Sequence, residues 1–390
     1  MAQLEIRFNG FSDEWVEKTL DEISDKVIKG SAKADSLEIG QNAIYLDTKY
    51  LNTKSNPITT SANANVSEND VLILWDGSKA GVVYKGTKGV LGSTLKSLKI
   101  NSKTSSDYVY QVLKNSESII FDRYRTPNIP HVVKDFTRKF PIQLPTLPEQ
   151  QKIGALFSKY DAIIALREQK LKELNALKKG MLQQMFPKNG EKVPELRFEG
   201  FTYDWEERNL GDVTTWTKGQ GLTKEDLNEE RDGSEAVHYA DLYKFSPVMH
   251  NVIHWTNSDD GRIIPDNSLL FPASDVTPVG LARASTLRLS GVKAGGDVII
   301  GQLDESINSS FMSYQINANS KKILPLITGT TVKHVQAKSL ATVSVSITNM
   351  AEQTAIAGIF ERIDNLIALH QRKLDLLKEQ KKGLLEKVLL

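Results

Sequence analysis

Few residues of this chain combine the types and the spacing that catalysis or metal binding requires. His250 and His254 stand four residues apart, as in a zinc-binding helix, but Asn251 occupies the position where a metalloprotease has glutamate. We therefore interpret both as histidines of a loop or a strand. The sequence has no Gly-rich phosphate loop, no dinucleotide-binding glycine pattern and no recognisable Ser-His-Asp set. Residues 56–58 lack the second proline and the aromatic residue of the amino-methyltransferase signature. A stand-alone nuclease or methyltransferase is thus disfavoured.

Binding of a polyanion is the chemistry that the charge distribution favours. Residues 77–139 contain 12 Lys and Arg against 4 Asp and Glu, an excess of 8, whereas the whole chain has a net charge of only +1. The lysines alternate with glycines, which let the backbone approach a surface, and with serines, which contact phosphates. Such clustering is typical of nucleic-acid binding, although a solvated lysine-rich face is the common alternative. Residues 262–338 have a smaller excess of positive charge, with 8 basic against 5 acidic residues, so composition alone does not decide whether they bind a polyanion.

Composition also narrows the class of protein. A chain of 390 residues suffices for two domains with cores of their own. The absence of cysteine excludes disulfides and thiolate metal sites, which suits a reducing cytoplasm. We find no signal peptide and no apolar run of the ~18 residues that a membrane span needs. We therefore expect a cytoplasmic protein with no membrane partner.

The sequence contains two copies of the elements that must position the basic residues. An opening motif at residues 6–11, followed by Trp15, recurs at residues 196–201, followed by Trp205, with an offset of 190. A predicted long helix at residues 149–186 recurs without a gap at residues 352–390, with an offset of 203. Internal repeats determine architecture. The chain therefore reads as body, helix, body, helix, with a second body 13 residues longer than the first because 203 minus 190 is 13.

Both predicted helices carry an apolar seam in alternating steps of four and three residues, which predicts a coiled coil. The seam skips the same two positions in each copy: Arg167 and His370, then Lys178 and Lys381. Polar residues at seam positions commonly fix the register of a coiled coil. The alternative is that the stripe drifts onto Leu166 and Leu177, as it would on a straight helix.

Each body is predicted to be a small mixed β domain, because short apolar runs alternate with Gly, Asp, Asn and Ser. A last strand, residues 140–144 or 343–347, leads into each long helix, with prolines at the first junction and none at the second. The expected strands are residues 71–75, 81–84 and 119–121 in the first body and 268–271, 297–300 and 313–316 in the second.

With these features together, the whole chain resembles the specificity subunit of a type I restriction–modification system. The resemblance rests on LEIRFNGF and ELRFEGF with their tryptophans, on LILWDGSKAG at residues 72–81, on the junction LPTLPEQQKI at residues 144–153, and on the duplicated helix. The second junction, ITNMAEQTAI, lacks the prolines of the first. Residues 271–275 stand where the second body would have an Asp-Gly turn.

The resemblance implies an α+β fold of two pseudo-twofold repeats, each a mixed β-rich target-recognition domain followed by a long helix, with the two helices in an antiparallel coiled coil. Each domain would read half of a bipartite, asymmetric site on double-stranded DNA, and the helices would set the spacer. Two modification subunits would bind S-adenosylmethionine and methylate adenine, and restriction subunits would use ATP and Mg²⁺. This chain would be non-catalytic and hold no cofactor.

The expected divisions are 1–148 and 197–351 for the target-recognition domains, 149–186 and 352–390 for the helices, and 187–196 for the linker. A 38-residue helix spans roughly 57 Å, enough to separate half-sites one DNA turn, ~34 Å, apart. Because the target adenine must leave the stack, the DNA is expected to be deformed. The alternative is a coiled-coil scaffold that binds no DNA. The residues expected to contact DNA are Ser78, Lys79, Lys85, Lys88, Arg123, Tyr124 and Arg125 in the first body and Arg283, Lys293, Lys333 and His334 in the second.

His131 aligns with His334 at the 203 offset, immediately before each last strand. A structural histidine is the alternative to a DNA contact at these positions. The recognised bases, the spacer length, the partner contacts and the division between base and phosphate contacts do not follow from the sequence.

Overall fold

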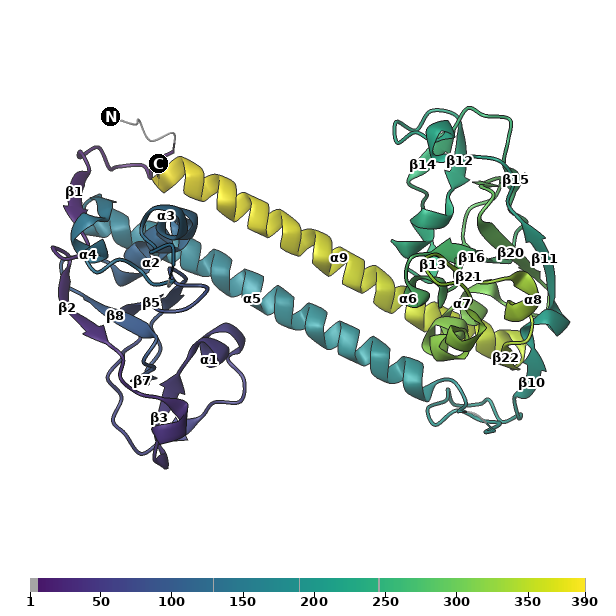
Figure 1. Ribbon diagram of the computed structural model, residues 1–390, viewed down its shortest axis with the longest axis horizontal. Coiled ribbons are helices and arrows are strands. Elements are labelled where there is room, and N and C mark those ends of the chain that lie inside the picture. Colours follow the sequence, from purple (N-terminus) through teal and green to yellow (C-terminus); the bar gives the residue numbers. More distant parts are fainter. Residues whose placement is uncertain (1–5, 129, 189, 245, 390) are drawn as a thin grey trace. The chain divides into compact units, whose positions relative to one another are not determined.

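The computed structural model describes residues 6–128, 130–188, 190–244 and 246–389. It divides into two compact units: unit 1 is Met1–Glu168 with Lys373–Leu390, and unit 2 is Gln169–Arg372. Each unit holds one globular body and a stretch of both long helices (Figure 1). Leu4 and Glu5, which precede the opening motif, Asn189 of the linker and Leu390 of the last expected helix lie outside the described residues.

The body of unit 1 is built on an antiparallel sheet with the strand order β2-β8-β5-β6, beside a smaller sheet with the order β4-β3-β7. Every residue of the inner strand β5 is buried, which explains its nearly continuous apolar sequence. The strands are β1 Val16–Thr19, β2 Ser24–Lys29, β3 Ile39–Leu46, β4 Thr59–Thr60, β5 Asp70–Leu74, β6 Val83–Lys85, β7 Val90–Leu91, β8 Leu95–Ile100 and β9 Pro141–Leu144. The helices are α1 Thr48–Thr53, α2 Ser106–Asn115, α3 Glu117–Arg123, α4 Phe136–Lys139 and α5 Leu147–Gln184.

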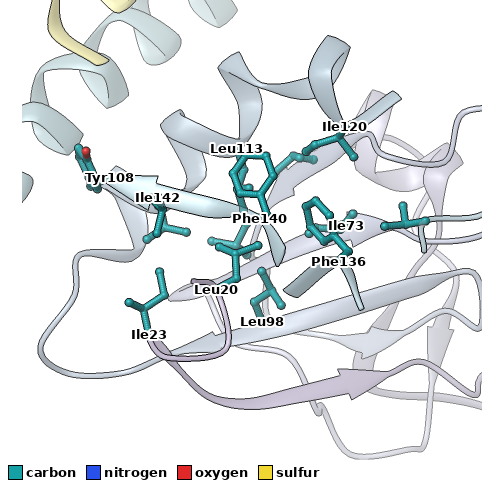
Figure 2. Close-up of a cluster of buried hydrophobic side chains, with 14 of the residues drawn as sticks. Leu20, Ile23, Ile73, Leu98, Tyr108, Leu113, Ile120, Phe136, Phe140 and Ile142 are labelled. Atoms are coloured by element: carbon teal, nitrogen blue, oxygen red, sulfur yellow. The ribbon is translucent and has the colours of Figure 1, made fainter. Parts of the chain in front are cut away.

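The core of unit 1 lies between this sheet and the short helices (Figure 2). Helix α2 begins at Ser105, whose hydroxyl accepts a hydrogen bond from the Tyr108 N–H at 3.4 Å. Large side chains of these helices are buried against the strands. The fully buried members include Leu20, Ile73, Leu98, Tyr108, Leu113, Ile120 and Phe136.

The body of unit 2 has a five-stranded sheet in the order β11-β20-β16-β18-β13 and a four-stranded sheet in the order β14-β12-β19-β15. The strands are β10 Glu206–Asn209, β11 Thr214–Lys218, β12 Ser234–Val237, β13 Val248–Met249, β14 His254–Thr256, β15 Arg262–Ile263, β16 Ser268–Pro272, β17 Ser274–Asp275, β18 Ser285–Leu287, β19 Lys293–Ala294, β20 Val298–Leu303, β21 Lys333–His334 and β22 Ser344–Ile347. The helices are α6 Pro278–Leu281, α7 Ser309–Ala318, α8 Ala337–Leu340 and α9 Met350–Leu389.

Two of the expected strands are wrong. Residues 119–121 belong to α3, which buries Ile120 and exposes Ile119 and Phe121. Residues 313–316 belong to α7, which begins at Asn308 and is buried over its first eight residues. A short apolar run does not distinguish a strand from a buried helix. Helix α3 buries too narrow a face, and α7 too broad a face, for the apolar residues to show a helical period. Helices α2 and α7 are counterparts, since their bounds differ by the same offset of 203 residues.

The opening motif and the last strand frame each body in the same way. Strand β1 pairs with β9 and β10 pairs with β22, both antiparallel and in equivalent register. Arg7 donates two hydrogen bonds, at 2.8 and 2.9 Å, to the carboxylate of Glu149, which is fully buried at the start of α5. Arg197 does the same to Glu352 at the start of α9, at 2.7 and 2.9 Å. The repeated Arg and Glu are therefore one structural device used twice.

The glutamine that follows each glutamate ties the long helix to the body. The Gln150 side chain accepts the Ser105 N–H at 2.9 Å, and the Gln353 side chain accepts the Asn308 N–H at 2.8 Å. The second junction compensates for its missing prolines with Asn349, whose side chain accepts the Glu352 N–H at 2.9 Å. Both helices thus begin at a defined residue despite their different sequences.

The two long helices run antiparallel within each unit. In unit 1, Lys381 contacts Asp161 at 2.6 Å. In unit 2, Lys178 contacts Asp364 at 2.5 Å. These pairs are equivalent under the 203 offset, and both lysines occupy skipped seam positions. They favour the register-fixing interpretation. The alternative would bury Leu166 and Leu177, which are 67% and 52% exposed.

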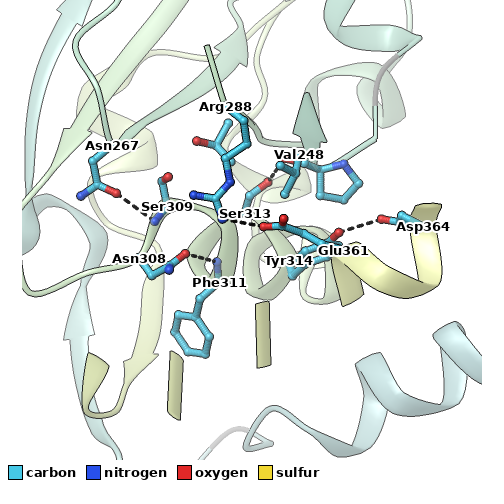
Figure 3. A network of polar contacts seen from close by, with 12 residues as sticks. Val248, Asn267, Arg288, Asn308, Ser309, Phe311, Ser313, Tyr314, Glu361 and Asp364 are labelled. Carbon is cyan, nitrogen blue, oxygen red and sulfur yellow. Dashed lines mark hydrogen bonds and ion pairs between the residues drawn. The ribbon is translucent and has the colours of Figure 1, made fainter. Parts of the chain in front are cut away.

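Each of these aspartates also binds its own body. The Gln111 side chain of α2 donates to Asp161 at 2.7 Å, and the Tyr314 hydroxyl of α7 donates to Asp364 at 2.8 Å. In unit 2, Arg288 adds an ion pair to Glu361 of α9 at 2.6 Å (Figure 3). Burial, together with the neighbouring Asp364, raises the pKa of Tyr314 above its ordinary value. Body and coiled coil are therefore joined through side-chain hydrogen bonds and ion pairs within each unit.

The observed helices begin two residues earlier than expected, and α5 also ends two residues earlier. Pro148 is tolerated in the first turn of α5 because the N–H groups there have no partner within the helix. At the other end, Phe186 leaves the helix and stacks on Phe360 of α9, with ring centroids 6.1 Å apart.

Candidate nucleic-acid interface

A turn follows the buried strand β5 in unit 1, and we call residues 75–81 the β5 turn. The Trp75 carbonyl accepts the Val132 N–H at 2.9 Å, and Asp76 pairs with His131. Gly77 has φ +114°, a region that favours glycine. Ser78 and Lys79 are exposed at the tip. The turn therefore presents a hydroxyl and an ammonium on a hydrogen-bonded frame.

Arg125 braces this turn. Its guanidinium donates to the Ser78 carbonyl at 2.8 Å and lies 3.5 Å from the centroid of the Phe121 ring. Arg123, at the end of α3, is exposed. The ring of Tyr124 instead packs on Phe136 and Phe140 of the core, at 5.3 and 5.6 Å. The arginines are thus better placed than Tyr124 to face a ligand.

Two further lysines stand beside the β5 turn. Lys29 and Lys96 pair across strands β2 and β8, and Lys29 lies 3.8 Å from Asp76. The Lys96 ammonium lies 3.3 Å from the centroid of the Trp75 ring. Burial lowers the pKa of Lys96, and the charge of Lys29 lowers it further. The sequence did not single out Lys29, because only sheet pairing brings it to this place.

The structure does not bring Lys85 and Lys88 to the β5 turn. Lys85 is paired with Val71, at the opposite end of the β5–β6 hairpin. There it forms an ion pair with Asp107 at 2.6 Å. Lys88 is exposed beyond that end. The sequence cluster of lysines therefore divides between two ends of one hairpin, because antiparallel pairing reverses the chain direction.

Unit 2 has the same turn after β16, and we call residues 273–280 the β16 turn. The Ala273 carbonyl accepts the Val335 N–H at 3.1 Å, as Trp75 accepts that of Val132. Strands β17 and β21 then pair Ser274 with His334. Ser274 therefore stands in the place of Asp76, and no Asp-Gly turn is present at residues 271–275. Both His131 and His334 pair with the second residue after the buried strand.

The expected basic residues of unit 2 are also divided. Lys333 lies beside Asp275 in the β17–β21 ribbon, and His334 is exposed. Arg283 donates to the Tyr243 carbonyl at 2.8 Å, so its guanidinium supports a short 3-10 helix. Lys293 lies on β19, where its ammonium donates to the Ser258 carbonyl at 2.7 Å.

The histidine pair forms no metal site. His254 lies on β14 and hydrogen-bonds to Asp241 at 2.9 Å, while His250 is exposed. Across the described residues, no group of three or more His, Cys, Asp and Glu could hold a metal ion. In that same part of the chain, no helix is long and apolar enough to cross a membrane.

Known proteins share this architecture. The family model described as type I restriction modification DNA specificity domain matches the chain twice, over residues 12–176 and 203–379. The chain belongs to this family. This specificity-domain protein is 27% identical over 395 residues to the type I restriction enzyme MjaVIII specificity subunit of Methanocaldococcus jannaschii, an alignment that covers 93% of the chain and 89% of that relative. The putative MjaX specificity subunit of the same organism is 22% identical over 320 residues, 79% of the chain and 73% of the relative.

A solved structure has the same fold. The crystal structure of the type I restriction–modification S subunit from M. genitalium covers 100% of this specificity-domain protein and 99% of its own chain, with a TM-score of 0.68 at 14% identity. The resemblance read from the sequence is confirmed by the two family matches, and the expected tandem fold is confirmed as well. The chain is a specificity subunit with two DNA-recognition domains.

Proposed function

We propose that each body reads one half of a bipartite, asymmetric DNA sequence and that α5 and α9 set the spacer between the halves. The observation that carries this is the pair of equivalent turns. The frame around them is the same in both units, yet Ser78 and Lys79 stand in one turn where Val276 and Thr277 stand in the other. A shared scaffold with different tips suits two different base sequences. We also propose that the two domains, the two helices and the linker have the boundaries expected from the sequence.

In unit 1, we propose that the β5 turn and its neighbours form the DNA-facing surface. Lys79 lies on the turn and Lys29, Lys96 and Arg125 lie beside it, and the Asp76 carboxylate is 3.8 Å from the Lys29 ammonium. Cations of this density neutralise phosphates and release counterions. Lys85, Lys88 and Arg123 remain candidates for contacts outside the turn, as Arg283 and Lys293 do in unit 2.

The chain itself is proposed to be non-catalytic and to hold no cofactor. Modification subunits would bind S-adenosylmethionine and methylate adenine, and restriction subunits would bind ATP and Mg²⁺. The observations behind this proposal are the names of the relatives, which are specificity subunits.

Each long helix offers one apolar face away from the seam, and we assign these faces to the two modification subunits. Ile163 and Leu166 are exposed on α5, and Leu366 and Leu369 are exposed at the equivalent positions of α9. Residues three apart share a helix face. Leu166→Lys and Leu369→Lys should each remove one modification subunit, counted by native mass spectrometry. The exposed Val193→Lys, in the linker, is the matched control; full occupancy of either variant would reject the assignment.

The test of the function is adenine-methylome sequencing of a host that expresses this chain with its modification partners. We expect one asymmetric motif of two defined halves around a non-specific spacer, absent when this chain is omitted. Methylation of a single continuous motif would refute the proposal that each body reads one half of the site. Failure of the assembled complex to bind any duplex would support the coiled-coil scaffold instead.

A further inference from the structure

Three valines are exposed at the β16 turn of unit 2. Val276 and Val279 are 73% and 69% exposed, and Val332 is 44% exposed. The β17–β21 ribbon pairs Asp275 with Lys333, and one further step in this register puts Val276 opposite Val332. Val279 is carried by α6, which packs beside β21. The ribbon and α6 therefore bring the three exposed valines to one turn, and we call these three residues the apolar patch.

The patch is held by its own hydrogen bonds. The Asp275 carboxylate accepts the Val276 N–H at 2.6 Å and the Thr277 hydroxyl at 3.1 Å. The Thr277 hydroxyl in turn accepts the Gly280 N–H at 3.3 Å. A Cβ at Gly280 would stand only 1.3 Å from the Asp275 carboxylate, so any larger residue there would displace this side chain from the turn. The negative charge of Asp275 is thereby engaged inside the turn.

Valine suits a preorganised contact, because a β-branched side chain has few rotamers to lose on binding. Two basic residues flank the patch on one strand, since Lys333 follows Val332 and the exposed His334 comes next, while the acidic Asp275 on the other strand is engaged by the turn. An apolar tip beside a cation matches a DNA groove, in which phosphates flank the base edges. In unit 1, the equivalent turn carries Ser78 and Lys79, whose hydroxyl and ammonium suit polar groups instead.

Resting on the proposed function, in which each body reads bases, we propose that Val276, Val279 and Val332 read the C5-methyl group of thymine in the major groove of the second half-site. The methyl group is the feature of a base edge that an apolar side chain can recognise, and it distinguishes thymine from cytosine. Because adenine pairs with thymine, a half-site that contains a methylated adenine always offers at least one thymine.

The test uses the complex of this chain with its modification partners and a duplex that carries the sequence found by methylome sequencing. Deoxyuridine replaces thymidine in one half-site at a time, which removes the C5-methyl group and leaves base pairing intact. We expect binding, measured by fluorescence anisotropy, to weaken about fourfold for each contacted methyl. The penalty should appear in the half-site that unit 2 reads.

The assignment to these residues comes from the variant Val276→Ser/Val279→Ser. It should bind the thymidine duplex more weakly than the natural chain and show a smaller penalty for deoxyuridine in that half-site, where Val332 alone remains. Any penalty in the other half-site should persist. Both positions are exposed, so we expect folding to be preserved, and circular dichroism checks it. Val193→Ser is the matched control and should keep the full deoxyuridine penalty.

Three outcomes would overturn this assignment. The first is equal binding of thymidine and deoxyuridine duplexes in both half-sites. The second is a penalty that survives unchanged in the double variant. The third is a double variant that loses its modification subunits in the absence of DNA, which would make the patch a protein contact. Absence of binding to the identified duplex by the natural complex would instead refute the proposed function itself.

Discussion

The ion pair between Lys178 and Asp364 should stabilise unit 2 measurably, and we predict its size from its surroundings. Both side chains are 18% exposed, and the two groups are 2.5 Å apart. Among the residues that the structure describes, Asp364 also accepts a hydrogen bond from the Tyr314 hydroxyl. The Lys178 ammonium also lies 5.6 Å from the centroid of the Tyr314 ring. Removing the lysine therefore leaves a largely buried carboxylate with one neutral partner.

The expected cost follows from two limits. A hydrogen bond to a charged group contributes about 1.5–3 kcal/mol, and breaking a fully buried ion pair costs about 3–5 kcal/mol. Partial exposure puts Lys178→Met near the lower range, at about 2 kcal/mol, a factor of about 30 in the local opening equilibrium. The equivalent Lys381→Met in unit 1 should cost less, because Asp161 is 38% exposed.

Hydrogen exchange with mass spectrometry can measure each unit separately. Amides of residues 169–184 and 350–372 should lose protection in Lys178→Met, and those of residues 150–168 should not. A double-mutant cycle with Asp364→Asn isolates the pair. A coupling energy near zero, or an equal loss of protection in both units, would refute the view that these seam lysines fix the register.

The other predictions concern DNA binding, spacing and pH. Lys79→Ala should weaken binding and reduce the salt slope by about one, measured by titration at several salt concentrations; the exposed Lys179→Ala on α5 should leave the slope unchanged, and an unchanged slope for Lys79→Ala would remove that residue from the interface. A seven-residue insertion that keeps the seam at residues 174–177 should lengthen the spacer and leave both half-sites unaltered, and methylome sequencing that found new half-site bases with the old spacer would contradict it. Because the folded-state pKa of Tyr314 is raised, its contribution to the free energy of unfolding should be fully present below about pH 10 and should be lost as the pH rises above it. Tyr314→Phe should therefore show a smaller fall in melting temperature between pH 9 and 11 than the natural chain. An identical fall in both proteins would contradict the burial argument.

The sequence alone determined the repeated frame. The constant offsets of 190 and 203 residues located the opening motifs, the last strands and both helices, because a structural device used twice needs the same residues twice. The skipped seam lysines were visible for the same reason. Glu149 with its copy Glu352 and Arg7 with its copy Arg197 were also visible as repeats. Their pairing was not, since contacts across 142 and 155 residues leave no local pattern.

The tertiary structure decided which basic residues can face a ligand. Lys79 and Lys85 are six residues apart in the chain, yet they lie at opposite ends of a hairpin, and only sheet pairing brings Lys29 to the first of these ends. The sequence could not show that Arg283 supports a backbone turn or that Val276 is exposed, because burial is set by contacts from distant segments. Local spacing records periodicity and repeats. The chemistry of a surface depends on which segments of the chain meet there.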